Sequence, residues 1–226
     1  MEDVSDKTAP ERLQAIQTEL SELARKSNRA PDDITLIAVS KTHGAETITP
    51  VLEAGHRVFG ENRVQEAAGK WPALRRVYTD VQLHLIGALQ SNKAAEAVGL
   101  FDFIHSLDRP KLAAALARAM AESGRKPRLF VQVNTGDEPQ KAGVPVADVA
   151  GFVGDCRTQH GLSIEGLMCL PPLGDAAGPH FALLGKLAAS LDLACLSMGM
   201  SADYPAAVSL GATHIRLGTA IFGPRG

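Results

Sequence analysis

The sequence predicts a single (β/α)8 barrel with one extra helix at its N-terminus, formed by residues 1–226 as one domain. Eight short apolar runs alternate with helical patterns along the chain, and this alternation is typical of a parallel sheet. Eight repeats favour closure of that sheet into a barrel. The 226 residues are 45% hydrophobic and 21% charged, an ordinary globular composition that can supply one large core.

The opening helix is predicted from a capping signal and from its apolar spacing. Thr8 and Glu11 have the positions of a capping box, in which the two residues satisfy each other's free backbone amides. The apolar residues that follow are three or four positions apart, namely Leu13, Ile16, Leu20 and Leu23. That spacing places them on one face of an amphipathic helix.

The strand and helix pattern then continues to the end of the chain. Predicted strands cover residues 34–40, 57–60, 83–87, 103–107, 129–134, 164–170, 194–198 and 214–217. Predicted helices cover residues 45–54, 63–77, 92–98, 110–122, 147–159, 180–190 and 203–210. An open doubly wound sheet is the alternative fold. No GxGxxG or GxxxxGK[ST] motif follows the first strand, which disfavours the dinucleotide- and nucleotide-binding versions of that sheet.

Charge and composition exclude several classes of partner. The chain has 23 Lys+Arg against 25 Asp+Glu, a formal net charge of -2, which gives no electrostatic basis for binding nucleic acid or an anionic membrane. No apolar stretch approaches the roughly 18 residues of a membrane span, and the first residues do not resemble a signal peptide. We therefore expect a cytoplasmic protein. Cys156, Cys169 and Cys195 lack disulfide or metal-ligand spacing, so we expect reduced thiols and no metal site.

Binding groups of a (β/α)8 barrel gather where its strands end, and Lys41 directly follows the first predicted strand. A lysine amine between apolar walls at the barrel mouth is suited to attack an aldehyde and form a Schiff base. A solvated lysine at a strand end is the alternative, which position alone favours. The choice therefore depends on the residues that surround Lys41.

The loops after the seventh and eighth strands predict a phosphate site. Barrels often bind phosphate there, because glycine lets the backbone approach the ligand and Ser or Thr adds a hydroxyl donor. Ser201 follows the seventh strand, and Gly218 and Thr219 follow the eighth. Glycine and serine in loops are often only turn formers. The presence of both segments in the two expected loops favours the phosphate interpretation.

Three further polar residues lie on or near predicted strands. Arg216 is expected to point inward beneath a ligand, where its guanidinium would hydrogen-bond a pyridine nitrogen without readily protonating it. An ion pair with a neighbouring strand is the alternative for Arg216. Asn62 offers donors and an acceptor for a phenolic oxygen or an aldehyde. His84 is expected either to pack as a flat ring near the ligand or to be a hydrogen-bonded core histidine.

Taken together, these segments resemble one family, the pyridoxal phosphate homeostasis proteins of the YggS/PROSC type. The matching segments run in order along most of the chain and cover residues 38–41, 59–66, 84–93, 105–108, 133–134, 141–143, 196–201 and 216–223. No single segment is specific. Their number and order make the resemblance specific.

The resemblance implies an alanine racemase-like barrel that carries pyridoxal 5′-phosphate as a Schiff base on Lys41, with Arg216 facing the ring nitrogen. By the same resemblance, the other residues that hold the cofactor are Asn62, Ser201, Gly218 and Thr219. The family is regarded as buffering or delivering the cofactor in vitamin B6 homeostasis, without a robust enzymatic activity. The partners expected from it are the cofactor and the apo-enzymes that receive it.

Two other functions stay open. A slow amino-acid racemase, or another pyridoxal phosphate-dependent enzyme, would use Lys41 both to bind the cofactor and to move protons. Racemases of this type add a β-domain that helps supply an opposing acid/base. We expect neither that domain nor a second base opposite Lys41 here, which favours a carrier. The third possibility is a barrel enzyme that binds a small phosphorylated metabolite and uses Lys41 as a base. No large exposed apolar stripe is evident, so we expect a monomer.

Overall fold

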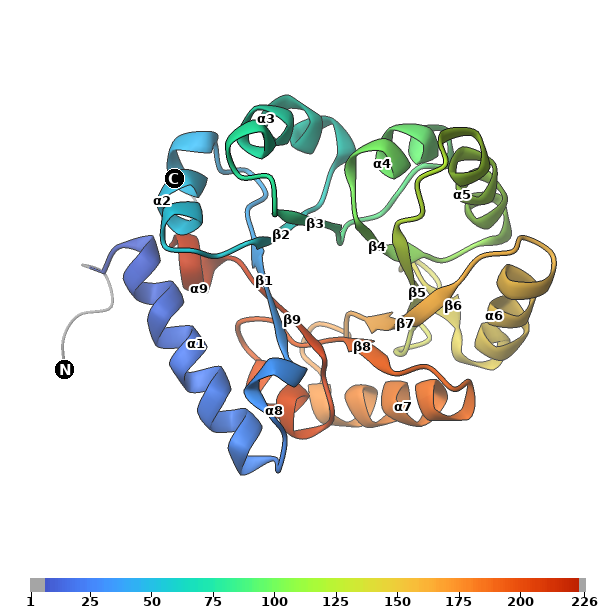
Figure 1. Ribbon diagram of the computed structural model, residues 1–226. Helices are drawn as coiled ribbons and strands as arrows, with labels where there is room; N and C mark the ends of the chain where they lie inside the picture. The colour runs from blue at the N-terminus through green and yellow to red at the C-terminus, as the bar shows by residue number, and fades with distance from the viewer. Residues whose placement is uncertain (1–6, 224–226) are drawn as a thin grey trace.

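Eight parallel strands close into a barrel in the computed structural model of the protein, which describes residues 7–223 (Figure 1). The barrel strands are β1 (Thr35–Val39), β2 (Val58–Glu61), β3 (Gln82–Leu85), β4 (Phe103–Leu107), β5 (Arg128–Asn134), β7 (Ile164–Cys169), β8 (Cys195–Ser197) and β9 (His214–Leu217). They pair in the order β4-β3-β2-β1-β9-β8-β7-β5, and β4 also pairs with β5, which completes the ring. The predicted closed barrel is confirmed, and the open sheet is excluded.

Helices surround the strands, as Figure 1 shows. They are α1 (Ala9–Lys26), α2 (Ala45–Glu53), α3 (Val64–Val77), α4 (Ala94–Leu100), α5 (Pro110–Ser123), α6 (Val149–Thr158), α7 (Ala177–Ser190), α8 (Tyr204–Ser209) and α9 (Thr219–Phe222). The extra helix α1 packs against α8 and α9. Its predicted capping box is present, since the Thr8 side chain accepts from the Glu11 amide and the Thr8 amide donates to Glu11 Oε2 at 2.7 Å. No helix within residues 7–223 is long and apolar enough to cross a membrane.

The register of the strands brings several chain segments together at one end of the barrel. Ile37 of β1 is paired with Arg216 of β9, and Val39 is paired with Gly60 of β2. A Cβ atom on Gly60 would lie 2.7 Å from Ile37 Cγ2, so glycine leaves room for the Ile37 side chain. Because parallel strands end at the same rim, the segments that follow β1, β2, β8 and β9 meet there.

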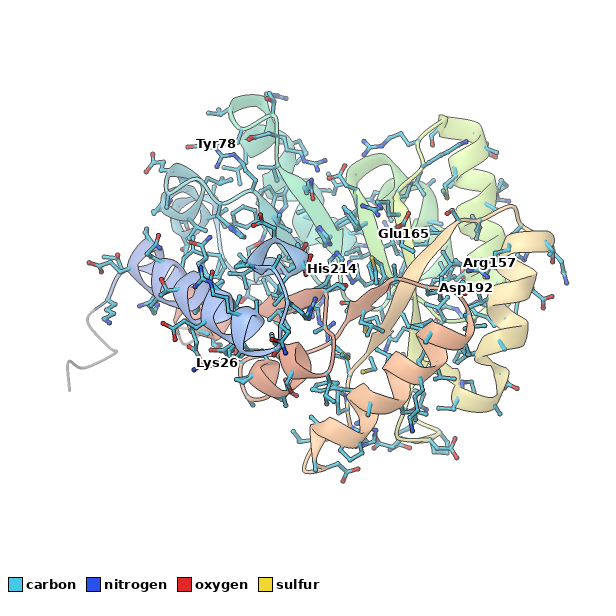
Figure 2. All side chains as sticks on the ribbon, turned by 60° about the horizontal axis from the view of Figure 1, so that its bottom comes forward. Lys26, Tyr78, Arg157, Glu165, Asp192 and His214 are labelled. Carbon is cyan, nitrogen blue, oxygen red and sulfur yellow. The ribbon has the colours of Figure 1, made fainter. Side chains whose placement is uncertain are left out.

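The opposite end of the barrel is closed by contacts among residues at the strand beginnings. Figure 2 labels His214, the first residue of β9, and Glu165, near the beginning of β7. Arg128 donates to Glu165 Oε2 at 2.6 Å, and its guanidinium lies 5.1 Å from the centre of the Phe103 ring. This end is therefore tied together by an ion pair and a cation–π contact.

One short strand and one short α-helix were not predicted from the sequence. The strand β6 (Val144–Pro145) pairs with the end of β5, outside the closed ring, and two residues are too few to show an alternating pattern. The helix α9 begins at Thr219, within the segment interpreted as a phosphate loop. The helix α7 begins three residues before its predicted start, because Pro179 lies in its first turn. Proline is tolerated there, since the amide hydrogen that it lacks would have no helical partner.

Candidate functional site

A cavity of about 250 Å³ lies at the rim where β1, β2, β8 and β9 end. Its lining consists of Val39, Lys41, His43, Asn62, Ile86, Leu170, Met200, Ser201, Arg216, Gly218 and Thr219. Six of the seven predicted site residues therefore meet in one cavity, although they come from loops far apart in the sequence. The seventh, His84, is not part of the lining.

Lys41 enters this cavity from the short segment that connects β1 to α2. The side chain is partly exposed, and within residues 7–223 no carboxylate lies within ion-pair distance of its amine. The next residue, Thr42, has a φ of 67°, a left-handed conformation that is rare for a β-branched residue. The backbone around Lys41 is thus held in one unusual shape while its amine stays free of a counter-ion.

Arg216 forms the inner wall of the cavity as a fixed cation. Its side chain is 4% exposed and donates to Ser197 Oγ at 2.6 Å and to the Cys169 carbonyl at 2.9 Å. Burial lowers the pKa of Arg216 to about 10, so the guanidinium remains charged at neutral pH. It offers only donors to a ligand. The ion pair that was the alternative for Arg216 is not formed within the described residues.

His84 lies inside the barrel as part of a buried row of polar side chains behind Arg216. Its ring stacks on Phe103, with ring centres 4.1 Å apart, and its Nδ1 lies 3.0 Å from His105 Nε2. His105 Nδ1 lies 2.9 Å from Ser197 Oγ, the same hydroxyl that accepts from Arg216. Burial lowers the pKa of both histidines well below the usual range. Of the two predicted alternatives, His84 therefore fits the hydrogen-bonded core histidine. It is connected to the cavity-lining Arg216 through His105 and Ser197.

The two predicted phosphate loops lie side by side at the cavity mouth. Gly199 has a φ of 95°, and a Cβ there would lie 2.6 Å from Ala207 Cβ, so glycine is needed for the turn that leads to Ser201. Gly218 lies against the end of β1, where its Cβ would be 3.3 Å from the Val39 carbonyl. Both hydroxyl-bearing residues, Ser201 and Thr219, are exposed. They are accessible to a ligand that enters from solvent.

Sequence reasoning missed part of the lining. His43, Ile86, Leu170 and Met200 were not proposed as site residues, yet all four border the cavity. Ile86 and Leu170 each follow a strand directly, so the strand-end rule that found Lys41 would have found them too. His43 stacks on Phe222 of α9, with ring centres 5.0 Å apart, and its position depends on a helix that was not predicted.

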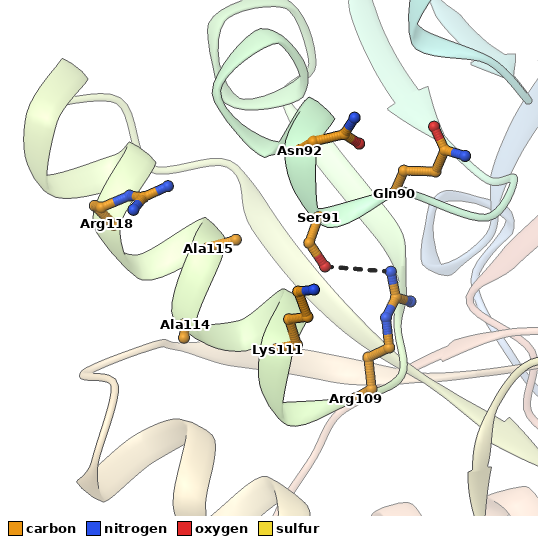
Figure 3. A pocket seen from close by; sticks show the side chains of 8 residues that line it. All are labelled: Gln90, Ser91, Asn92, Arg109, Lys111, Ala114, Ala115 and Arg118. Carbon is orange, nitrogen blue, oxygen red and sulfur yellow. Dashed lines mark hydrogen bonds between the residues drawn. The ribbon is translucent and has the colours of Figure 1, made fainter.

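A second, larger cavity of about 630 Å³ lies between α5 and the segment before α4 (Figure 3). Figure 3 shows Arg109, Lys111 and Arg118 beside the alanines of α5, and its dashed line joins Arg109 to Ser91. Arg109 donates to Ser91 Oγ at 3.4 Å. It contains none of the predicted site residues. Several of its side chains, including Lys111 and Arg118, are exposed. The smaller cavity at the strand ends is therefore the candidate site.

Comparison with known proteins identifies the family. The chain matches the family model described as alanine racemase, N-terminal domain, over residues 12–226. It is 33% identical to the pyridoxal phosphate homeostasis protein of Escherichia coli (strain K12) over 222 residues, 94% of this chain and 95% of that protein. It is 39% identical to the pyridoxal phosphate homeostasis protein of Synechocystis sp. (strain ATCC 27184 / PCC 6803 / Kazusa) over 204 residues, 86% of this chain and 93% of that one. The chain belongs to the pyridoxal phosphate homeostasis protein family.

Solved structures agree with this family membership. PipY of Synechococcus elongatus PCC7942, determined with pyridoxal phosphate bound, is 42% identical and superposes with a TM-score of 0.84 over 96% of this chain and 100% of PipY. Alanine racemase of Clostridium difficile 630 is 13% identical, with a TM-score of 0.69 over 92% of this chain and 56% of the racemase. The likeness to the racemase shows a shared barrel fold. The family resemblance predicted from the sequence motifs is therefore confirmed.

Proposed function

We propose that this protein binds pyridoxal 5′-phosphate in the 250 Å³ cavity and buffers or delivers it as part of vitamin B6 homeostasis. The observation that carries the proposal is the meeting of a free lysine amine, two hydroxyls and a buried guanidinium in one cavity. The names of the relatives and the bound cofactor in PipY support it. The family is named for homeostasis of the cofactor and not for a reaction.

The donors in the cavity fit the chemical groups of pyridoxal phosphate. Lys41 has an amine without a carboxylate partner among residues 7–223, and such an amine is suited to the aldehyde. Ser201 and Thr219 add hydroxyl donors, and Gly218 allows close backbone approach, which together suit a phosphate. The apolar side chains of Ile86, Leu170 and Met200 supply walls for a flat ring. Asn62 would hold the phenolic oxygen.

Each polar residue has a distinct role in this proposal. The cofactor supplies an aldehyde and an electron-withdrawing ring. Lys41 would bond through its nitrogen to the aldehyde carbon, with loss of one water. Arg216 would donate a hydrogen bond to the ring nitrogen and leave it unprotonated, because a guanidinium does not readily give up a proton. An unprotonated ring withdraws electrons weakly, which suits storage of the cofactor better than catalysis.

Borohydride reduction followed by peptide mass spectrometry tests this proposal. We expect the protein to become yellow with pyridoxal phosphate and to carry a phosphopyridoxyl group on Lys41 after reduction. Lys41→Ala should remove the visible absorption without unfolding the protein. A label found on Lys93 or Lys141 in place of Lys41 would contradict the assignment.

One observation favours a second function, a slow amino-acid racemase or related enzyme. The sequence predicted no second titratable group near Lys41, but His43 also lines the cavity, and an imidazole can act as a general acid or base. Incubation of the loaded protein with L-alanine, with chirality and transamination products followed over time, separates the two functions. We expect no turnover at ordinary enzyme rates, roughly 1–1000 per second. Turnover at such rates that is lost in His43→Gln would establish the enzyme.

A further inference from the structure

A largely shielded lysine on α3, Lys70, contacts the backbone before and after Lys41. Its Nζ donates to the Ser40 carbonyl at 2.9 Å and to the His43 carbonyl at 2.9 Å. These two carbonyls flank Lys41 and Thr42 in the chain. The Lys70 side chain is only 10% exposed, so these hydrogen bonds are largely shielded from water and define the backbone path firmly.

Two carboxylates complete this arrangement around Lys70. Glu61 Oε1 and Glu66 Oε1 each lie 2.9 Å from Lys70 Nζ. Glu61, fully buried at the end of β2, also accepts from Ser40 Oγ at 2.5 Å and from Trp71 Nε1 at 3.0 Å. Glu66 Oε1 accepts from the backbone amide of Thr42. Residues 40, 42 and 43 are therefore all bound by the Lys70 cluster, defined as Glu61, Glu66 and Lys70.

The cluster accounts for the unusual backbone next to Lys41. A left-handed conformation is unfavourable for a β-branched residue such as Thr42 and persists only where the surroundings fix it. The hydrogen bonds from the cluster provide that restraint on both sides of the residue. They contact the backbone and leave the Lys41 side chain free to reach into the cavity.

The cluster also sets the charge behind Lys41. Lys70 pairs with both carboxylates, so neither is left to pair with the Lys41 amine. Other charged or titratable groups near this segment are His43 in the same loop, Glu46, whose carboxylate lies against Gly44, Arg63, which acts on Glu66, and Arg216 in the cavity lining. Burial raises the pKa of Glu61, so without the Lys70 charge this carboxyl would take up a proton. The partly exposed Glu66 would remain as an uncompensated carboxylate behind the segment and would favour the protonated Lys41 amine, which is not nucleophilic.

We propose that the Lys70 cluster is a positioning device that sets both the direction and the nucleophilicity of the Lys41 amine. This inference rests on the proposed function, in which Lys41 captures the aldehyde of pyridoxal phosphate. Lys70 itself does not line the cavity. It acts through the backbone and through charge balance.

Two variants of Lys70 and one control test the inference. Lys70→Met removes the charge while keeping most of the side chain, and Lys70→Arg keeps the charge. Arg76→Met, at an exposed position of the same helix, is the matched control. In the apo-protein, acetylation of Lys41 by acetic anhydride is followed against pH by mass spectrometry, with exposed Lys111 as the internal reference. The rate of pyridoxal phosphate capture is then measured by absorbance.

We expect Lys70→Met to move the acetylation profile of Lys41 to more alkaline pH and to slow capture by about 10- to 100-fold, the penalty typical of a misplaced reacting group. Lys70→Arg should restore the profile toward that of the wild type, and Arg76→Met should change neither quantity. A merely structural role for Lys70 would lower thermal stability without moving the profile. A folded Lys70→Met protein with the wild-type profile and capture rate overturns the inference.

Glu66→Gln provides the test if Lys70→Met does not fold. It keeps an oxygen for the Thr42 amide but removes a negative charge, so the acetylation profile should move to lower pH, and an unchanged profile contradicts the inference. The wild type reports separately on the proposed function. Failure of wild-type Lys41 to capture the cofactor rejects that function together with the role of Lys70, whereas normal capture with no effect of Lys70→Met rejects only the role of Lys70.

Discussion

Ser201 and Thr219 present hydroxyl groups to the cavity from two different loops, and neither side chain supports the fold. Both residues are exposed, and neither hydroxyl makes a side-chain hydrogen bond within residues 7–223. An exposed hydroxyl without a partner contributes little to folding. The same hydroxyl becomes valuable when a phosphate dianion is placed beside it, because charge-assisted hydrogen bonds are stronger than neutral ones.

We therefore predict that Ser201→Ala and Thr219→Ala each weaken pyridoxal phosphate binding by about 10- to 100-fold, corresponding to a charge-assisted hydrogen bond of roughly 1.5–3 kcal/mol. The melting temperature of the apo-protein should change little. Absorbance titration measures the affinity, and Ser209→Ala, an exposed serine of α8 outside the cavity, is the control. Pyridoxal without its phosphate should bind weakly to the wild type. Equal affinity for pyridoxal and pyridoxal phosphate would show that these loops do not hold the phosphate.

At the scale of elements, the strands were predictable and the small connecting elements were not. All eight barrel strands overlap their predicted ranges, because each is a short apolar run between polar turns. The strand β6 and the helix α9 are two and four residues long, too short for any hydrophobic period. The strand β6 forms because the closed barrel places it next to β5, and the helix α9 begins beside the end of β1. Both depend on tertiary contacts that a local sequence pattern does not contain.

The candidate site shows the same division between local and tertiary information. Lys41, Ser201 and Thr219 were predictable because each follows a barrel strand, and the barrel brings strand ends together. The positions of His84 and His105 were not predictable from a strand pattern. In a strand that is buried on both faces, the residues on either face are equally apolar, so the sequence does not show which residues point into the barrel. The Lys70 cluster is a tertiary feature too, because only the packing of α3 on the barrel brings Lys70 beside the segment after β1.

Several histidines lie in the interior of the described part of the chain, and their pKa values are lowered. His84 and His105 are fully buried, and His214 is 8% exposed at the beginning of β9. Burial is the main cause that lowers the pKa of all three, to about 4 for His214 and well below the usual range for the other two. Nearby positive charges, including Arg128 and Arg216, act in the same direction. The native state therefore excludes protons that the unfolded chain would accept.

This difference predicts acid destabilisation of the whole barrel. Between the unfolded pKa of about 6.5 and the lower folded pKa values, the unfolded state binds more protons, so the free energy of unfolding falls as the pH falls below about 6.5. Each fully neutral histidine contributes up to about 1.4 kcal/mol per pH unit in that window. Above the unfolded pKa all three are neutral in both states, and their contribution to the pH dependence disappears.

Urea unfolding of the apo-protein at a series of pH values measures this slope, and His84→Phe is the sharpest variant. Phenylalanine keeps a flat ring to stack on Phe103 and removes one titrating group. It also removes the contact of His84 Nδ1 with His105 Nε2 and the His84 Nε2 atom, which has no hydrogen-bond partner within the described residues. We expect the slope below pH 6.5 to decrease by up to about 1.4 kcal/mol per pH unit. A His84→Phe protein with the wild-type slope would mean that His84 is not kept neutral in the native barrel, and that the buried row behind Arg216 carries a proton at mildly acid pH.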